Sequence, residues 1–212
     1  MNKAIKVVLV ILILVISFLI SYILNDDKKK FEHPANNNAV QYPKEYINLI
    51  KESPLANSFN FPVGPPNAKG YYNAQIFGKN NHLGDDWNGS GGGNSDLGDP
   101  VFSIANGLVV FAKDLKGGWG NVVIVLHNYG TVNKPILVES LYAHLKDVFV
   151  SKGDHLSKGK KIGTIGNANG RYLAHLHFEI RSNVGMPVGG GYSENTKGYL
   201  DPTEFIKNHR KL

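Results

Sequence analysis

Short runs of β-branched and aromatic residues, separated by glycine-rich turns, constrain the fold of this chain more than any other feature. The runs that read as strands lie, from about residue 59 onward, at 101–112, 121–127, 140–145, 160–165 and 175–181. The turns lie at 84–98, 116–120, 166–170 and 185–191. Short strands at this spacing predict a mainly β domain, an antiparallel sheet or sandwich. The 24 glycines among 212 residues also favour a turn-rich β domain over a helical bundle.

An almost unbroken apolar run covers residues 7–24. At about 1.5 Å per residue, a helix of this length comes close to spanning the hydrocarbon core of a bilayer. The run has no small-residue cleavage site at its end, so we predict an uncleaved signal anchor after a cytoplasmic segment, 1–6. Cleavage is the alternative. Lysines flank the run on both sides, so the positive-inside rule does not fix its orientation.

The rest of the chain divides by composition. Residues 25–58 are mainly polar and read as a linker with a possible short helix at 45–52, whose apolar face would carry Tyr46, Leu49 and Ile50. The β domain is expected at 59–206, followed by a tail, 207–212. Asp201 and Pro202 predict the start of a closing helical turn.

The chain has no cysteine, which excludes disulfides, thiolate zinc sites and a cysteine nucleophile. Any metal site must use His, Asp or Glu. The formal net charge is +6, but no basic stripe with interleaved aromatic residues is present, so no nucleic-acid partner is predicted. The charge suits a membrane surface or an anionic polymer, or serves solubility alone.

Two histidines, His175 and His177, lie two residues apart in a strand-like segment. Side chains two apart on a strand face the same side, so both imidazoles should point into one space. Two histidines on one face favour a zinc site. A half-polar strand face exposed to solvent is the alternative.

A second pair, His82 and Asp86, lies four residues apart, which is again an even spacing if the segment is extended. Asp86 is then a better ligand than Asp85, which would face away. A polar loop ahead of a glycine-rich turn is the alternative. His144 stands in an apolar strand and by itself reads as a core histidine. Glu179 could orient a ligand histidine, although a surface glutamate is the commoner case.

Together these motifs resemble the lysostaphin-type zinc metalloendopeptidases, which cleave the peptide part of bacterial peptidoglycan. The family pattern is a His and an Asp four apart, then Tyr-x-His-Leu, then His-x-His, and all three parts occur here in that order at His82–Asp86, 142–145 and His175–His177. The connecting turns also match, so the resemblance covers about residues 60–206. His127 matches a position where the family often has histidine, and we interpret it as structural.

The resemblance implies one Zn²⁺ per chain, held by His82, Asp86 and His177, with His144 and His175 as the catalytic pair. The residues alone would also allow both strand histidines to bind metal. Three protein ligands leave a position for water, whereas four would make a closed structural site. A departure from the family pattern is the longer glycine-rich stretch at 87–97, which we expect to form a loop at the rim of the cleft.

The implied function is a zinc metalloendopeptidase that hydrolyses peptide cross-links of peptidoglycan. The chain would be a single-pass membrane protein with its catalytic domain outside the cytoplasm, or a secreted protein if the anchor is cleaved. One alternative is a non-catalytic cell-wall-binding regulator of another hydrolase on the same fold. The other is a metal-free β domain that binds carbohydrate or a protein partner.

Overall fold

The structure is a computed structural model that describes residues 42 and 44–211. All of them belong to one unit, Tyr42–Leu212. Among these residues no helix is both long and apolar enough to cross a membrane. The predicted anchor, 7–24, and the predicted cytoplasmic segment, 1–6, lie outside the described residues.

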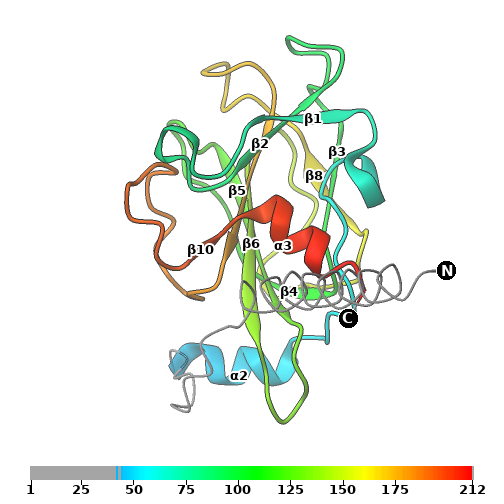
Figure 1. The fold of residues 1–212 in the computed structure, drawn as a ribbon, viewed down its shortest axis with the longest axis vertical. Helices are drawn as coiled ribbons and strands as arrows, with labels where there is room; N and C mark the ends of the chain where they lie inside the picture. The colour runs from blue at the N-terminus through cyan, green and yellow to red at the C-terminus, as the bar shows by residue number, and fades with distance from the viewer. Residues whose placement is uncertain (1–41, 43, 212) are drawn as a thin grey trace, which may run out of the picture. The chain divides into compact units, whose positions relative to one another are not determined.

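An antiparallel sheet of eight strands forms the centre of the unit (Figure 1). Its strands follow the order β1 (Tyr71–Gln75), β2 (Asp85–Gly89), β9 (Leu176–Arg181), β6 (Leu137–Leu145), β5 (Asn121–Asn128), β4 (Gly107–Asp114) and β7 (His155–Leu156), with β10 (Tyr199–Leu200) paired to β9. A smaller sheet pairs β3 (Pro100–Phe102) with β8 (Lys161–Thr164). Every pairing between these strands is antiparallel, which confirms the predicted mainly β, antiparallel domain.

The large sheet buries apolar side chains on both faces. In β5, Val123 and Val125 belong to a core cluster that also contains Val101 and Ile162 of the small sheet. The alternate residues belong to a second cluster, on the opposite face: Val122, Ile124 and Leu126. The period of two along a strand therefore decides which residues enter which core.

Helix α2 (Lys44–Glu52) covers part of the second cluster. Tyr46, Leu49 and Ile50 pack there, as the predicted apolar face requires. Figure 1 places α2 beside the loop that joins β5 to β6, and the Tyr42 hydroxyl donates to the Pro135 carbonyl of that loop at 3.3 Å. This helix falls within the segment that composition assigns to the linker, 25–58.

The remaining helices are short. They are η1 (Gly64–Ala68), η2 (Lys79–Asn81) and α3 (Pro202–Asn208). Asp201 caps α3 by accepting a hydrogen bond from the Glu204 amide at 2.9 Å, as predicted.

One strand prediction is wrong in its extent. Residues 101–112 form two strands, β3 and β4, in different sheets. A turn separates them, in which the Ser103 hydroxyl donates to the Ala105 carbonyl at 2.7 Å. Gly107 then begins β4 so close to β5 that a Cβ atom there would lie 2.6 Å from the Val125 side chain.

Candidate metal centre and active site

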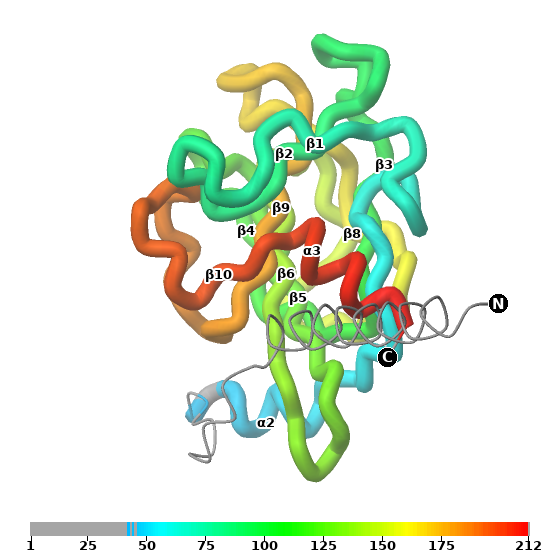
Figure 2. The backbone as a smooth tube through the Cα atoms, viewed as in Figure 1, coloured from blue at the N-terminus to red at the C-terminus, as the bar shows by residue number. Residues whose placement is uncertain are grey.

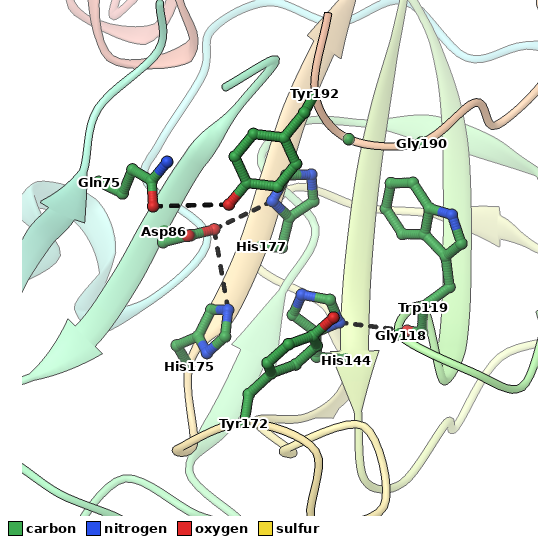
Figure 3. A pocket seen from close by; sticks show the side chains of 11 residues that line it. Gln75, Asp86, Gly118, Trp119, His144, Tyr172, His175, His177, Gly190 and Tyr192 are labelled. Carbon is green, nitrogen blue, oxygen red and sulfur yellow. Dashed lines mark hydrogen bonds and ion pairs between the residues drawn. The ribbon is translucent and has the colours of Figure 1, made fainter. Parts of the chain in front are cut away.

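A cleft of about 510 Å³ lies over one end of the large sheet (Figure 3). Its lining comes from β1, β2, β6 and β9, from the β4–β5 turn, and from the loops before and after β9: Gln75, Asp86, Gly118, Trp119, His144, Tyr172, His175, His177, Gly190, Gly191 and Tyr192. Four of the five predicted site residues belong to this set. The fifth, His82, lies fully buried beside them.

Three polar atoms converge at the cleft floor. The Nδ1 atom of His177 lies 3.0 Å from the Nε2 atom of His82 and 3.0 Å from the Oδ1 atom of Asp86. The His82 Nε2 atom lies 3.3 Å from the same Asp86 oxygen. Among the residues that the structure describes, these three side chains form a group able to hold a metal ion.

The strand register brings Asp86 to this group. Asp86 is the direct partner of His177 in the β2–β9 pair. Asp85 binds elsewhere, since its carboxylate accepts hydrogen bonds from the Thr203 hydroxyl at 2.6 Å and from the Phe77 amide at 3.0 Å. Asp86 therefore shares a space with His177, whereas Asp85 faces away, as the even spacing predicts.

The donor set fits zinc. Tetrahedral zinc with bonds of about 2.0–2.2 Å keeps its ligand atoms roughly 3.3 Å apart. The three spacings here, 3.0, 3.0 and 3.3 Å, are close to that value. Two imidazoles and one carboxylate leave a fourth position free for water or substrate.

The electrostatics of the group match its geometry. Burial alone would raise the pKa of Asp86, but hydrogen bonds from His177 and His82 hold that pKa below its usual value. Burial would likewise lower the pKa of His177, yet hydrogen bonds to Asp86 and Glu179 raise it to about 9. The site thus favours a positive charge between these side chains, which a divalent cation would also supply.

His144 has a strained backbone. Its φ of 61° lies in the left-handed region, which is uncommon for a residue other than glycine. The β5–β6 register shifts at this point, between Asn121 and Val123, so a bulge turns the strand as it enters the cleft. Strain of this kind costs about 1–3 kcal/mol and persists where the surroundings enforce it.

The second histidine at the cleft floor is His175, whose ring centroid lies 4.7 Å from that of His144. The His175 Nδ1–H donates to the Leu173 carbonyl at 2.8 Å. Its Nε2 atom lies 3.8 Å from the Asp86 carboxylate (Figure 3), so His175 and His177 do face the same side. His144 uses its Nδ1–H in the same way, toward the Trp119 carbonyl at 3.3 Å.

The environments of the two histidines differ. Burial, together with the nearby His177 and His175, lowers the pKa of His144 to about 3. His144 is therefore a neutral ring near pH 7, with its Nε2 lone pair free of the Trp119 contact.

Glu179 is buried, so the interpretation as a surface glutamate is wrong. It lies two residues beyond His177 on β9, and its Oε1 atom accepts a hydrogen bond from the His177 Nε2 atom at 3.0 Å. The even spacing along the strand is the sequence signal that points to this contact. A carboxylate behind a ligand histidine fixes which ring nitrogen faces the metal.

Sequence reasoning missed the aromatic rim of the cleft, Trp119, Tyr172 and Tyr192. It also expected the glycine-rich stretch 87–97 at this rim, but no residue of that stretch lines the cleft. Two of its side chains accept hydrogen bonds from backbone amides instead. The Asp96 carboxylate accepts from Gly89 within the stretch at 2.8 Å, and the Asn94 side chain accepts from Ala174 before β9 at 2.8 Å.

His127 lies away from the cleft in β5 and is fully buried. Its Nδ1–H donates to the Asn106 carbonyl at 2.8 Å, and its Nε2 atom lies 2.7 Å from the Ser140 hydroxyl. Both ring nitrogens are therefore satisfied by neutral groups, which agrees with a structural role.

Comparisons with known proteins agree with a peptidase fold of this kind. Residues 86–189 match the model of peptidase family M23. Lipoprotein NlpD of Yersinia enterocolitica is 38% identical over 84 residues, which are 40% of this chain and 78% of that protein. The DD-carboxypeptidase/endopeptidase Mpg of Neisseria meningitidis serogroup B is 40% identical over 91 residues, 43% of this chain and 19% of that protein. The murein hydrolase activator NlpD of Escherichia coli K12 is 34% identical over 98 residues, 43% of this chain and 24% of that protein.

The fold has a counterpart among solved structures. The crystal structure of cbpa from L. salivarius REN superposes with a TM-score of 0.50 at 24% identity, covering 71% of this chain and 95% of that chain. This chain spans most of the length of the Yersinia relative. It spans only about a fifth to a quarter of the Neisseria and Escherichia coli relatives. The chain belongs to peptidase family M23.

Proposed function

We propose that this protein is a zinc-dependent endopeptidase that hydrolyses peptide cross-links of bacterial cell-wall peptidoglycan. One observation carries the proposal: the five predicted side chains lie together, four in the cleft lining and His82 buried beside them. Three of them would serve as ligands and two as proton-transfer groups. The family description, a peptidase, and the Neisseria relative's name, a DD-carboxypeptidase/endopeptidase, support it. Segment 7–24 would anchor the chain, with the catalytic unit outside the cytoplasm.

The metal ligands are His82, Asp86 and His177. Zinc bound there would polarise the scissile carbonyl and lower the pKa of a bound water. With zinc in place of the proton on Nδ1, His177 would bind through that atom, while its Nε2–H donates to Glu179. Asp86 adds a negative charge that favours a cation at this position.

Proton transfer falls to the two remaining histidines. We assign proton acceptance to the Nε2 atom of His175, which faces Asp86 while its Nδ1–H is held by the Leu173 carbonyl. His144 is the poorer acceptor because its pKa is low. The His144 ring lines the same cleft beside His175. Negative charge that develops on the scissile carbonyl oxygen would favour transfer of the water proton from His175 to the His144 Nε2 atom, which would then donate a hydrogen bond to that oxygen.

The test is digestion of purified peptidoglycan by the full chain in detergent, with new peptide ends counted. The zinc-loaded protein should release them, whereas the chelator-treated protein and a His177→Ala variant should not. A His155→Ala variant, changed at an exposed histidine, is the matched control and should retain activity. Metal analysis should find one zinc per chain in the wild type and the control.

The alternative is a non-catalytic regulator of another hydrolase, which the name of the Escherichia coli relative favours. A chain that holds zinc, releases no peptide ends from any wall type and raises the activity of a second hydrolase would support this alternative. The same result would overturn the proposed enzyme.

A further inference from the structure

Three buried charged or polar side chains line one face of β9 at alternate positions: His177, Glu179 and Arg181. His177 donates through Nε2 to one Glu179 oxygen at 3.0 Å. Arg181 donates to the other oxygen through its Nε atom at 2.7 Å, and its terminal Nη2 atom forms an ion pair with that oxygen, also at 2.7 Å. The candidate metal ligand is therefore connected directly to a fully buried carboxylate–guanidinium pair.

Arg181 also holds the loop that follows β9. Its Nη2 atom donates to the Val188 carbonyl at 2.7 Å, and its Nη1 atom lies 3.4 Å from the Pro187 carbonyl. Two residues further along, Gly190, Gly191 and Tyr192 line the cleft. Figure 2 shows this loop, between β9 and β10, beside the segment that joins β1 to β2. We call residues 187–192 the cleft wall.

The cleft wall needs such a support. Gly189 and Gly191 have φ angles of 74° and 77°, and Gly190 lies between them. A run of three glycines loses much conformational freedom when it is ordered. A guanidinium with its planar set of donors can bind a carboxylate and backbone carbonyls at once, which an ammonium group cannot do with the same geometry.

We propose that Glu179 and Arg181 are positioning residues that set, through one buried ion pair, both the orientation of the metal ligand His177 and the position of the cleft wall. The inference rests on the proposed function in one respect, that His177 binds the metal. Arg181 itself lines no part of the cleft. A change at Arg181 should therefore weaken metal binding and loosen the cleft wall without touching the metal or the substrate.

The two ligand histidines differ in what holds the ring nitrogen that faces away from the metal. The Nδ1 atom of His82 is buried and has no hydrogen-bond partner among the residues that the structure describes. Of the two, only His177 has its ring orientation fixed by a side-chain acceptor among the described residues. That acceptor is the Glu179 carboxylate, which Arg181 holds in turn.

The experiment compares full-chain variants Glu179→Gln, Arg181→Lys and the double variant with the wild type. Matched controls are Glu204→Gln, in an exposed ion pair, and Arg210→Lys, whose guanidinium donates to the Pro66 carbonyl far from the cleft. Three readouts serve: the zinc dissociation constant, the visible spectrum of the Co²⁺-loaded protein, and amide exchange at 188–192.

Each single variant should raise the zinc dissociation constant about 10- to 100-fold, the range for groups that orient a ligand histidine. The Co²⁺ spectrum should change and exchange at 188–192 should accelerate, while both controls behave as the wild type. Because the two residues act as one unit, their effects should not multiply. The zinc dissociation constant of the double variant should therefore be close to that of the single variant that binds zinc less tightly.

Folded variants with wild-type zinc affinity, spectrum and exchange would overturn the inference and leave the proposed function intact. A wild type that binds no zinc would instead overturn the proposed function. If the variants do not fold, the wild type decides: zinc should slow amide exchange at Val188 and Gly189, whose carbonyls accept from Arg181 and Trp119. Equal exchange with and without zinc would overturn the coupling.

Discussion

Gly166 lies against the backbone of His144 so closely that a Cβ atom at Gly166 would come within 2.1 Å of the His144 carbonyl oxygen. The same atom would meet the Lys146 amide at 2.5 Å. Glycine at position 166 is thus required for the left-handed backbone conformation of His144. That conformation brings the His144 imidazole into the cleft.

A Gly166→Ala variant should lose both activity and stability. The methyl group has backbone atoms against it, so the strand must shift, at a cost of about 1–3 kcal/mol or more in unfolding free energy. Chemical denaturation and peptide release from peptidoglycan measure the two effects. Gly190→Ala, where a Cβ atom meets nothing within 4 Å, should leave the unfolding free energy unchanged. A Gly166→Ala protein as stable and active as the wild type would contradict the packing argument.

Acid should destabilise the domain through His127. Burial lowers the pKa of this residue from 6.5 to about 4, despite the hydrogen bond to Asn106. The unfolded chain therefore binds a proton below pH 6.5 that the folded chain refuses. This difference in pKa contributes about 3 kcal/mol to the unfolding free energy. The contribution is fully present above pH 6.5 and is lost as the pH falls toward 4.

Urea unfolding at pH 7.5, 5.5 and 4 measures this loss, and His127→Gln isolates it. The variant should be less stable at pH 7.5, where it loses packing, but should show a flatter pH dependence than the wild type. Parallel pH profiles for the two proteins would assign the acid sensitivity to other groups.

The indole of Trp119 connects the β4–β5 turn to the cleft wall, because its Nε1–H donates to the Gly189 carbonyl at 3.0 Å. A Trp119→Phe variant keeps an aromatic ring but loses this donor. A typical net hydrogen bond contributes about 1 kcal/mol, so kcat/KM for a cross-linked peptide should fall roughly five-fold. Trp87→Phe is the contrasting variant, since the buried Trp87 Nε1 atom has no partner among the described residues. The Trp87→Phe change should lower the unfolding free energy and leave kcat/KM unaltered. Equal falls in kcat/KM for both variants would contradict the prediction.

Much of the candidate site follows from local periodicity in the sequence. The period of two along a strand predicts that His175 and His177 share a face and that Asp86, not Asp85, joins them. The geometry of β2 and β9 agrees. Such inferences need only the knowledge that the segments are extended.

Other features depend on contacts between distant parts of the chain and escape this reasoning. Glu179 reads as a surface residue by type, and its burial becomes favourable because Arg181 and His177 lie beside it. Trp119 and Tyr192 reach the cleft from loops whose positions are set by long-range hydrogen bonds, such as that between the Leu83 amide and the Gly191 carbonyl at 2.9 Å. The break between β3 and β4 likewise reflects the close approach of Gly107 to β5.

Helix α2 should contribute to stability through one buried polar contact. The Tyr46 hydroxyl donates to the Glu139 carboxylate at 2.5 Å, and the Gly185 amide donates to the same oxygen at 3.0 Å. Burial raises the pKa of Glu139, and the hydrogen bond from Tyr46 opposes that rise. Removal of the hydroxyl leaves the buried carboxylate with one donor fewer, so Tyr46→Phe should lower the unfolding free energy by about 1–3 kcal/mol.

Tyr72→Phe is the matched control, because Tyr72 is about half exposed, at 49%, and its hydroxyl can be hydrated after folding. Urea denaturation of both variants at pH 7.5 makes the comparison. A Tyr46→Phe protein within 0.5 kcal/mol of the control, roughly the scatter of surface substitutions, would mean that α2 is held by its apolar face alone. The larger loss would show that α2, which lies within the predicted linker, is joined through the Glu139 carboxylate to Gly185 in the loop that carries the cleft wall.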